Sequence, residues 1–160
     1  MERETKITDM NLLGAFITDS ISNGSEVNLT VTGDSMYPLF KSRVDTVVLA
    51  MPENPQKLKK RDIVFYRRDD GSYILHRILK IKNGLLTIAG DNEMKKEFPV
   101  RCDQVIGVVK RFTRNKKEYS TNEAWYKFYS FIWCAIFPFR PFALRLLLKL
   151  ANLRARRKNK

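Results

Sequence analysis

Ser35 has the type and setting of a serine nucleophile. It lies in Gly33–Pro38, which follows a predicted strand and begins a turn. A serine at a strand end exposes its hydroxyl beside local backbone N–H groups, and the oxyanion of a tetrahedral intermediate needs such donors already in place. Because serines are common in turns, Ser35 alone predicts little, and its significance depends on a general base elsewhere in the chain.

His76 is the chain's one histidine and the natural candidate for that base. It lies within the predicted strand Tyr73–Ile81, where alternation places it on one face with Ile74 and Ile78, and places Arg77 on the other. A lone histidine among apolar neighbours is usually a packing residue. However, an imidazole with an ordinary pKa near neutrality suits general-base catalysis.

A third polar segment, Gly90–Glu93, follows the predicted strand Leu85–Ala89. Such a sequence is normally a turn. A carboxylate there would hold the imidazole tautomer and stabilise the imidazolium that forms during catalysis. Asp91 is therefore a candidate for the supporting acid.

The elements that must position these residues are mostly strands. Six short segments have strand-like alternation or β-branched composition: Val27–Val31, Thr46–Ala50, Ile63–Tyr66, Tyr73–Ile81, Leu85–Ala89 and Val105–Phe112. Hairpin signals at 69–71 and 83–84 connect neighbouring strands, so the sequence predicts a mainly antiparallel β domain. Helical spacing of apolar residues over 7–21 predicts a short N-terminal helix that packs on it.

The composition changes sharply after residue 123. The 160 residues carry a formal net charge of +13, yet nine Lys and Arg and no acidic residue follow Glu123. The segment 124–139 is rich in aromatic residues, and 142–150 follows a Pro-containing break. Sixteen helical residues span only about 24 Å of a bilayer core of about 30 Å. We therefore expect 124–160 to contact an anionic membrane surface as interfacial helices or a shallow re-entrant hairpin. The alternative is a helix pair folded onto the β domain or used for self-association.

The cysteines indicate neither a disulfide nor a metal site. Cys102 and Cys134 are the only two, and Cys134 lies in the apolar aromatic segment. No Cys/His cluster has zinc-ligand spacing, so no metal and no cofactor are expected. The apolar run Leu12–Ile17 is too short for a secretory signal peptide, so no N-terminal export signal is expected.

Four short motifs occur in order along the chain: Gly-x-Ser-Met-x-Pro at 33–38, Asp-Ile-Val-Phe at 62–65, His-Arg at 76–77 and Gly-Asp-Asn at 90–92. Together they resemble the signal peptidase family and, more distantly, the LexA-type autopeptidases of the same clan. The match covers about residues 27–110 and implies a LexA/signal-peptidase-like β fold. Typical bacterial signal peptidases and LexA-type proteins have a lysine where this chain has His76. The chain resembles the archaeal and endoplasmic-reticulum branch, which has a histidine in the same His-Arg pair.

The resemblance leaves the supporting acid open. In the histidine branch an aspartate lies a few residues beyond Gly-Asp-Asn, and Glu97 falls near that place. Asp91 and Glu97 rank equally, and Asp103, which precedes the last predicted strand, ranks lower. Gly33 occupies the position where many bacterial signal peptidases have a hydroxyl residue. The N–H of Ser35 is therefore the one oxyanion donor that the sequence identifies.

These features predict a serine endopeptidase that cleaves signal or leader segments from precursor proteins, with Ser35 as nucleophile, His76 as base and a supporting acid. The resemblance implies small side chains before the scissile bond and a substrate docked as an extended strand. We expect an N-terminal helix over 1–26, a β catalytic domain over 27–120 and membrane-associating helices with a basic tail over 121–160. The alternatives are a LexA-like self-cleaving regulator, for which 1–26 is too short to add a DNA-binding domain, and a non-catalytic membrane adaptor. No nucleic-acid partner is expected.

The side of the membrane stays open. The positive-inside rule places the basic tail in the cytoplasm. If the C-terminal region spans once, the catalytic domain faces outward, although no N-terminal segment would start its export. If the region lies on the inner surface, the domain is cytoplasmic and the substrate is a leader peptide there.

Overall fold

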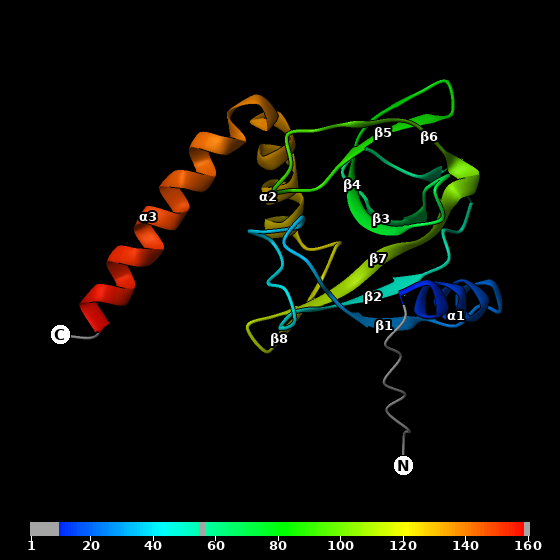
Figure 1. Ribbon diagram of the computed structural model, residues 1–160, viewed down its shortest axis with the longest axis horizontal. Coiled ribbons are helices and arrows are strands. Elements are labelled where there is room, and N and C mark those ends of the chain that lie inside the picture. The colour runs from blue at the N-terminus through cyan, green and yellow to red at the C-terminus, as the bar shows by residue number, and fades with distance from the viewer. Residues whose placement is uncertain (1–9, 55–56, 159–160) are drawn as a thin grey trace, which may run out of the picture.

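The computed structural model describes residues 10–54 and 57–158, with side chains for 12–54 and 57–150. Within them the chain forms an antiparallel β sheet, with a short helix before it and helices after it (Figure 1). The strands are β1 (Val27–Thr30), β2 (Thr46–Ala50), β3 (Ile63–Arg67), β4 (Tyr73–Lys82), β5 (Leu85–Ala89), β6 (Glu97–Arg101), β7 (Val105–Arg114) and β8 (Lys117–Ser120). The helices are α1 (Met10–Ser22), α2 (Ala124–Ala135) and α3 (Arg140–Lys158), with 3-10 turns η2 (Cys102–Gln104) and η3 (Phe137–Phe139). The predicted mainly antiparallel β architecture with flanking helices is confirmed.

The sheet has the strand order β1-β2-β7-β3-β4-β5-β6, and β8 also pairs with β7. Among the described strands, β1, β6 and β8 each have one partner and therefore lie at edges of the sheet. Figure 1 shows the sheet strongly curled, so that β3, β4 and β5 wrap around an interior. This curl brings segments that are distant in the sequence to the same region.

Two of the strands were not expected from the sequence. The strand β6 contains Pro99 and lies at a sheet edge, where a residue without an N–H is tolerated. The strand β8 is polar and follows β7 through Asn115 and Lys116, whose φ angles of 51° and 64° are those of a tight hairpin turn. Neither segment has the apolar alternation from which the other strands were predicted.

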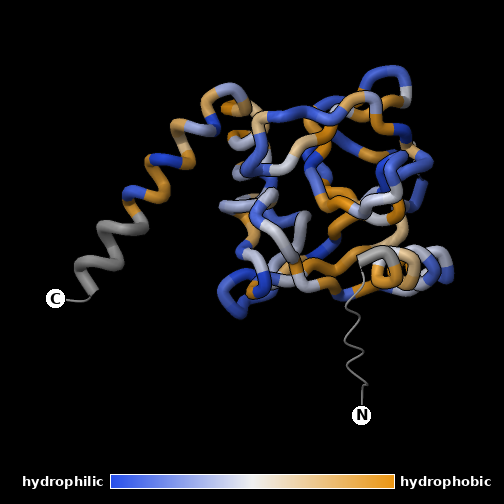
Figure 2. Tube along the Cα trace, viewed as in Figure 1, coloured by the Kyte–Doolittle hydropathy of each residue, from blue (hydrophilic) through white to orange (hydrophobic). Residues whose placement is uncertain are grey.

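The two larger of three apolar clusters among the described residues lie on opposite faces of the sheet. One packs α1 and the loop after β1 against β2, β3 and β7, and it contains Met36 and Phe40. The other fills the interior of the curl with residues of β3 to β7, such as Val64 and Ile78. Figure 2 shows apolar residues concentrated along these strands and polar residues in the connecting loops.

The helix α1 covers the first core. Ile17 and Ile21 are each 1% exposed, and Gly14 lies against the ring of Tyr73, where a Cβ would come within 2.3 Å of the ring. The sequence predicted a helix over 7–21. Its residues 7–9 lie outside the described residues, and the helix extends to Ser22.

The C-terminal helices differ in their bounds from the sequence prediction. The helix α2 ends at Ala135, earlier than the predicted 139. Pro138 follows closely, and a proline disfavours helical backbone angles at the residue that precedes it. The helix α3 continues through the basic segment and extends away from the β sheet (Figure 1). No single helix in the described residues is long and apolar enough to cross a bilayer. Taken together, the segments Ala124–Ala135 and Phe137–Leu150 have the length and apolar composition of a membrane span, but the chain bends by 75° between them.

Candidate active site

Ser35 lies in the loop between β1 and β2, which buried contacts hold in place. Asp45 is 1% exposed and its carboxylate accepts a hydrogen bond from the Lys41 N–H at 2.8 Å, across the loop. Met36 follows Ser35 directly and is packed in the core below α1. Gly33 has a φ of 80°, which glycine adopts without strain, and it turns the chain from β1 towards Ser35. The half-buried Ser35 is therefore held in place by the buried residues that follow it in the loop.

His76 lies on β4 opposite Val64 of β3, and only 2% of it is exposed. Its ring centroid is 6.3 Å from that of Tyr66. Ile74 and Ile78 pack with Tyr66 inside the curl, whereas the next residue, Arg77, is buried against α2. The predicted alternation along this strand is therefore confirmed, and it separates His76 from Arg77.

Gly90 lies between Ser35 and His76 and shows how close they are. A Cβ placed on Gly90 would lie 3.1 Å from His76 Nε2 and 3.1 Å from Ser35 Cβ. These two atoms are therefore at most twice that distance apart. The backbone N–H of Asn92 donates to the Ser35 carbonyl at 2.7 Å, which ties the 90–92 turn to the serine loop. No hydrogen bond joins the Ser35 hydroxyl to His76, a common feature of catalytic pairs without substrate.

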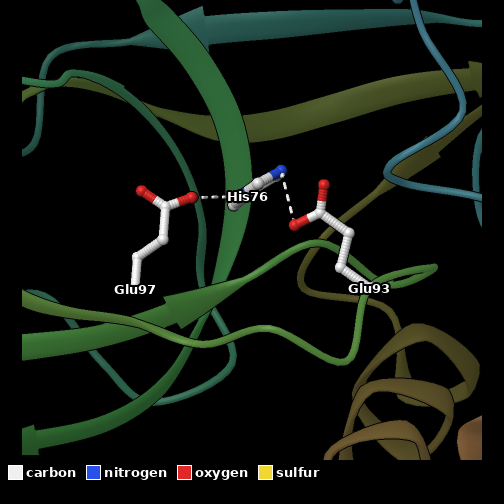
Figure 3. A group of neighbouring side chains, drawn as sticks. All are labelled: His76, Glu93 and Glu97. Atoms are coloured by element: carbon white, nitrogen blue, oxygen red, sulfur yellow. Dashed lines mark ion pairs between the residues drawn. The ribbon is translucent and has the colours of Figure 1, made fainter. Parts of the chain in front are cut away.

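Two glutamates flank the imidazole of His76 (Figure 3). Glu97, at the start of β6, places Oε1 3.3 Å from Nδ1. Glu93, in the turn before β6, places Oε2 3.6 Å from Nε2. The Glu97 contact is at ion-pair distance but lacks hydrogen-bond geometry, so buried Nδ1 has no hydrogen-bond partner. Glu97 is thus on the nitrogen that a supporting acid must face, and Glu93 is on the nitrogen that must take the serine proton.

Arg68 holds Glu97 in this position. Its guanidinium makes two hydrogen bonds to the Glu97 carboxylate, one from Nε to Oε2 at 2.8 Å and a short one from Nη2 to Oε1. Burial raises the pKa of Glu97, but the hydrogen bonds and charge of Arg68, with smaller contributions from Tyr66 and His76, together outweigh burial, and the pKa is lowered overall. Glu97 therefore carries a negative charge near neutral pH and can stabilise an imidazolium at His76.

The surroundings of His76 favour its neutral form. Burial lowers its pKa below the ordinary 6.5, and the negative charges of Glu93 and Glu97 offset only part of that effect. An imidazole that is neutral near pH 7 can accept a proton, which is the state that a general base needs.

Asp91, the other carboxylate ranked as a supporting acid, lies elsewhere. Its two oxygens accept hydrogen bonds from Arg77 Nε at 2.8 Å and Nη2 at 2.7 Å, and both residues are fully buried. Arg140 Nη2 is 3.8 Å from the same carboxylate, and Arg140 Nη1 donates to the Gly90 carbonyl at 2.8 Å. Trp133 Nε1 donates to the Asp91 carbonyl at 3.1 Å. This geometry gives Asp91 the role of fastening α2 and the start of α3 to the 90–92 turn.

The third-ranked acid, Asp103, is also away from His76. Its side chain is 73% exposed and lies 3.2 Å from Arg101 Nε. The sequence reasoning missed Glu93 and Arg68. The position of Glu93 directly after Gly-Asp-Asn was the one sequence feature that could have indicated its place beside His76. No sequence feature could have indicated the role of Arg68, because its pairing with Glu97 joins residues 29 positions apart.

His76, Glu93 and Glu97 are residue types that can bind a metal ion, and they lie close together. One ligand atom each from His76, Glu93 and Glu97 lies within 4.8 Å of the others. However, the two glutamates face different ring nitrogens, and both Glu97 oxygens are hydrogen-bonded to Arg68. The arrangement fits a base with a supporting acid better than a shared cation. Comparisons with known protein families and with curated proteins found no match for this chain.

Proposed function

We propose that this protein is a serine endopeptidase with a LexA/signal-peptidase-like fold that cleaves signal or leader segments from precursor proteins. The observation that carries the proposal is the meeting of Ser35 and His76 at Gly90, with Glu97 on the far nitrogen of the imidazole. Three segments far apart in the sequence supply these groups. The order of motifs along the chain supports the histidine-using branch of the signal peptidases.

In the proposed mechanism, Ser35 Oγ attacks the carbonyl carbon of the scissile peptide bond and its proton moves to His76 Nε2. Glu97 stabilises the imidazolium from the Nδ1 side. The N–H of Ser35 donates to no described residue, so it is available to the oxyanion. The C–N bond then breaks, Nε2 returns the proton to the leaving amine, and water hydrolyses the acyl-enzyme by the same base.

An extended substrate fits the sheet edge that leads to the nucleophile. Among the described strands, β1 pairs with β2 alone. Three residues after β1 ends at Thr30, the chain reaches Gly33 and the serine turn. A peptide added along β1 would present its backbone carbonyls towards Ser35. Recognition of backbone groups at a sheet edge explains how one site accepts many precursor sequences.

Membrane contact through 124–160 is part of the proposal. The buried face of α2 carries Tyr126, Ser130 and Trp133, whereas Phe128 is 68% exposed. Phe139 and Phe142 are 70% and 73% exposed near the bend. Large exposed aromatic side chains with flanking basic residues suit the interface of an anionic bilayer.

The proposal is tested by incubating the purified protein in detergent with a panel of precursor proteins bearing signal or leader segments. We expect the wild type to release a mature product, and the Ser35→Ala and His76→Ala variants to lose at least about 10³-fold in rate. Asp103→Asn is the matched control and should cleave at the wild-type rate. Full cleavage by Ser35→Ala would refute the assignment. A folded adaptor or regulator would show no precursor cleavage in any variant.

A further inference from the structure

A large basic cavity lies apart from Ser35 and His76. It has a volume of about 700 Å³ and is bounded by the loop after β2, by β7 and by α2. Two acidic side chains, Glu53 and Asp62, line it together with six cationic ones: Lys57, Lys59, Lys60, Arg61, Lys110 and Lys127. The proposed peptidase chemistry uses none of these residues.

Cationic side chains outnumber acidic ones in the lining of this cavity by six to two. None of its five lysines forms an ion pair with a described residue. Asp62 Oδ2 already accepts a hydrogen bond from the Lys59 N–H at 2.8 Å. Burial raises the pKa of Asp62, and the hydrogen bond from Lys59 together with the charges of Lys59 and Lys110 offsets part of that effect. Like charges gathered in one hollow repel one another, and a bound anion would relieve that repulsion.

Arg61 is held rigidly at the edge of the cavity. Its φ of 83° is unusual for a residue other than glycine. Its N–H donates to the Ile78 carbonyl at 2.8 Å, and its carbonyl accepts from Arg77 Nη1 at 3.1 Å. Its guanidinium lies 5.8 Å from the centre of the Phe131 ring. The sheet therefore fixes a cationic residue beside an apolar side chain of α2.

The helix α2 joins the cavity to the exposed apolar surface. Tyr126, Lys127 and Ser130 line the cavity, whereas Phe128 and Phe131 are 68% and 54% exposed. Phe131 is one helical turn after Lys127 and on the same side of α2. If α2 lies at a bilayer interface, these phenylalanines enter the apolar region and the cavity opens at the depth of the headgroups.

We propose that this cavity binds the phosphate-containing headgroup of an anionic phospholipid. A volume of about 700 Å³ exceeds what a single phosphate needs and suits a headgroup with its glycerol. The continuity with Phe128 and Phe131 favours a lipid over a soluble phosphate or a nucleic acid. The inference rests on the membrane contact in the proposed function, but not on the chemistry of Ser35.

The test is binding of the full chain to phosphatidylcholine vesicles with and without phosphatidylglycerol, measured by flotation. Lys57→Gln/Lys127→Gln removes two exposed charges from the cavity lining, one from the loop after β2 and one from α2. Lys80→Gln/Lys82→Gln removes two exposed charges from β4 and is the matched control. We expect the first variant to bind phosphatidylglycerol vesicles on the order of tenfold more weakly, and the control to stay within about twofold of the wild type.

Equal losses in the two variants, or no loss in either, would overturn the headgroup site in favour of diffuse attraction. Binding of free glycerol phosphate as tightly as of vesicles would also overturn it, as would tighter binding of duplex DNA than of phosphatidylglycerol vesicles. Ser35→Ala should bind vesicles like the wild type. The cavity variant should still cleave a soluble peptide, so failure of the peptidase proposal and failure of the lipid proposal are distinguishable.

Discussion

Replacement of Gly90 by alanine probes the meeting of Ser35 and His76 directly. The added Cβ would lie 2.6 Å from the Ser35 carbonyl oxygen, whereas ordinary contact begins at 3.4 Å. It would also lie 3.1 Å from His76 Nε2 and from Ser35 Cβ. The 90–92 turn and the serine loop must therefore separate by most of an ångström. Because the Asn92 N–H is hydrogen-bonded to that same carbonyl, the shift strains a backbone hydrogen bond that links the two segments.

A displacement of about 1 Å between reacting groups costs on the order of 10²-fold in rate. An extra methyl group in a packed site costs about 1–3 kcal/mol of unfolding free energy. We therefore expect Gly90→Ala to remain folded while kcat falls about 100-fold with little change in KM. The assay is steady-state cleavage of a precursor, alongside urea unfolding monitored by circular dichroism.

Gly107→Ala is the matched control. Its Cβ would lie 2.8 Å from Ile21 Cδ1, the end of a flexible side chain in the core below α1. It should lower the unfolding free energy by a similar amount and leave kcat unchanged. Wild-type kcat for Gly90→Ala, or equal kcat losses in the two variants, would refute the placement of the reacting pair.

Three further predictions follow from the structure. Asp91→Ala leaves the buried Arg77 guanidinium without its carboxylate partner and should lower the free energy of unfolding in urea by about 3–5 kcal/mol. The control Asp103→Ala should change it by no more than about 0.5 kcal/mol, and equal losses in the two variants would contradict the fastening role of Asp91. The pKa of His76 is lowered by burial and partly restored by Glu93 and Glu97, so Glu93→Gln and Glu97→Gln should each lower it further and move the acid limb of the kcat/KM profile to lower pH. Only Glu97→Gln should also reduce kcat, by about 100-fold. A shift of the acid limb to higher pH in either variant would contradict this prediction. Phe139→Ser/Phe142→Ser removes two exposed rings near the bend and should weaken binding to lipid vesicles in flotation without altering cleavage of a soluble peptide. Unchanged flotation would show that these rings do not contact the membrane.

The sequence predicted the strands that have apolar alternation or a short apolar run, and it missed β6 and β8, which have neither. The alternation over 73–79 correctly separated His76 from Arg77, because both faces of β4 are packed in apolar cores. The strand β6 was not predicted because its composition, which includes Pro99, is not typical of a strand. It forms because the edge of the sheet at β5 offers backbone groups with which it can pair. The strand β8 depends in the same way on its hairpin with β7.

The candidate site was predictable only in part, for a related reason. Ser35 and His76 belong to local motifs with characteristic residue types. The choice between Asp91 and Glu97 depends on which arginine each one meets, and those partners are set by the tertiary structure. Arg77 follows His76 in the chain but points to the opposite face and takes Asp91. Arg68 reaches Glu97 only because β3, β4 and β6 belong to one curled sheet.

The central claim is that Ser35 Oγ is acylated during turnover. It is tested most directly by mixing the protein with a peptide ester that has small side chains before the ester bond, stopping the reaction with acid and mapping the adduct by mass spectrometry. We predict an acyl group on the peptide that contains Ser35, absent from Ser35→Ala and much slower to form in His76→Ala. An adduct on another residue, or turnover of the ester by Ser35→Ala at the wild-type rate, would contradict the claim.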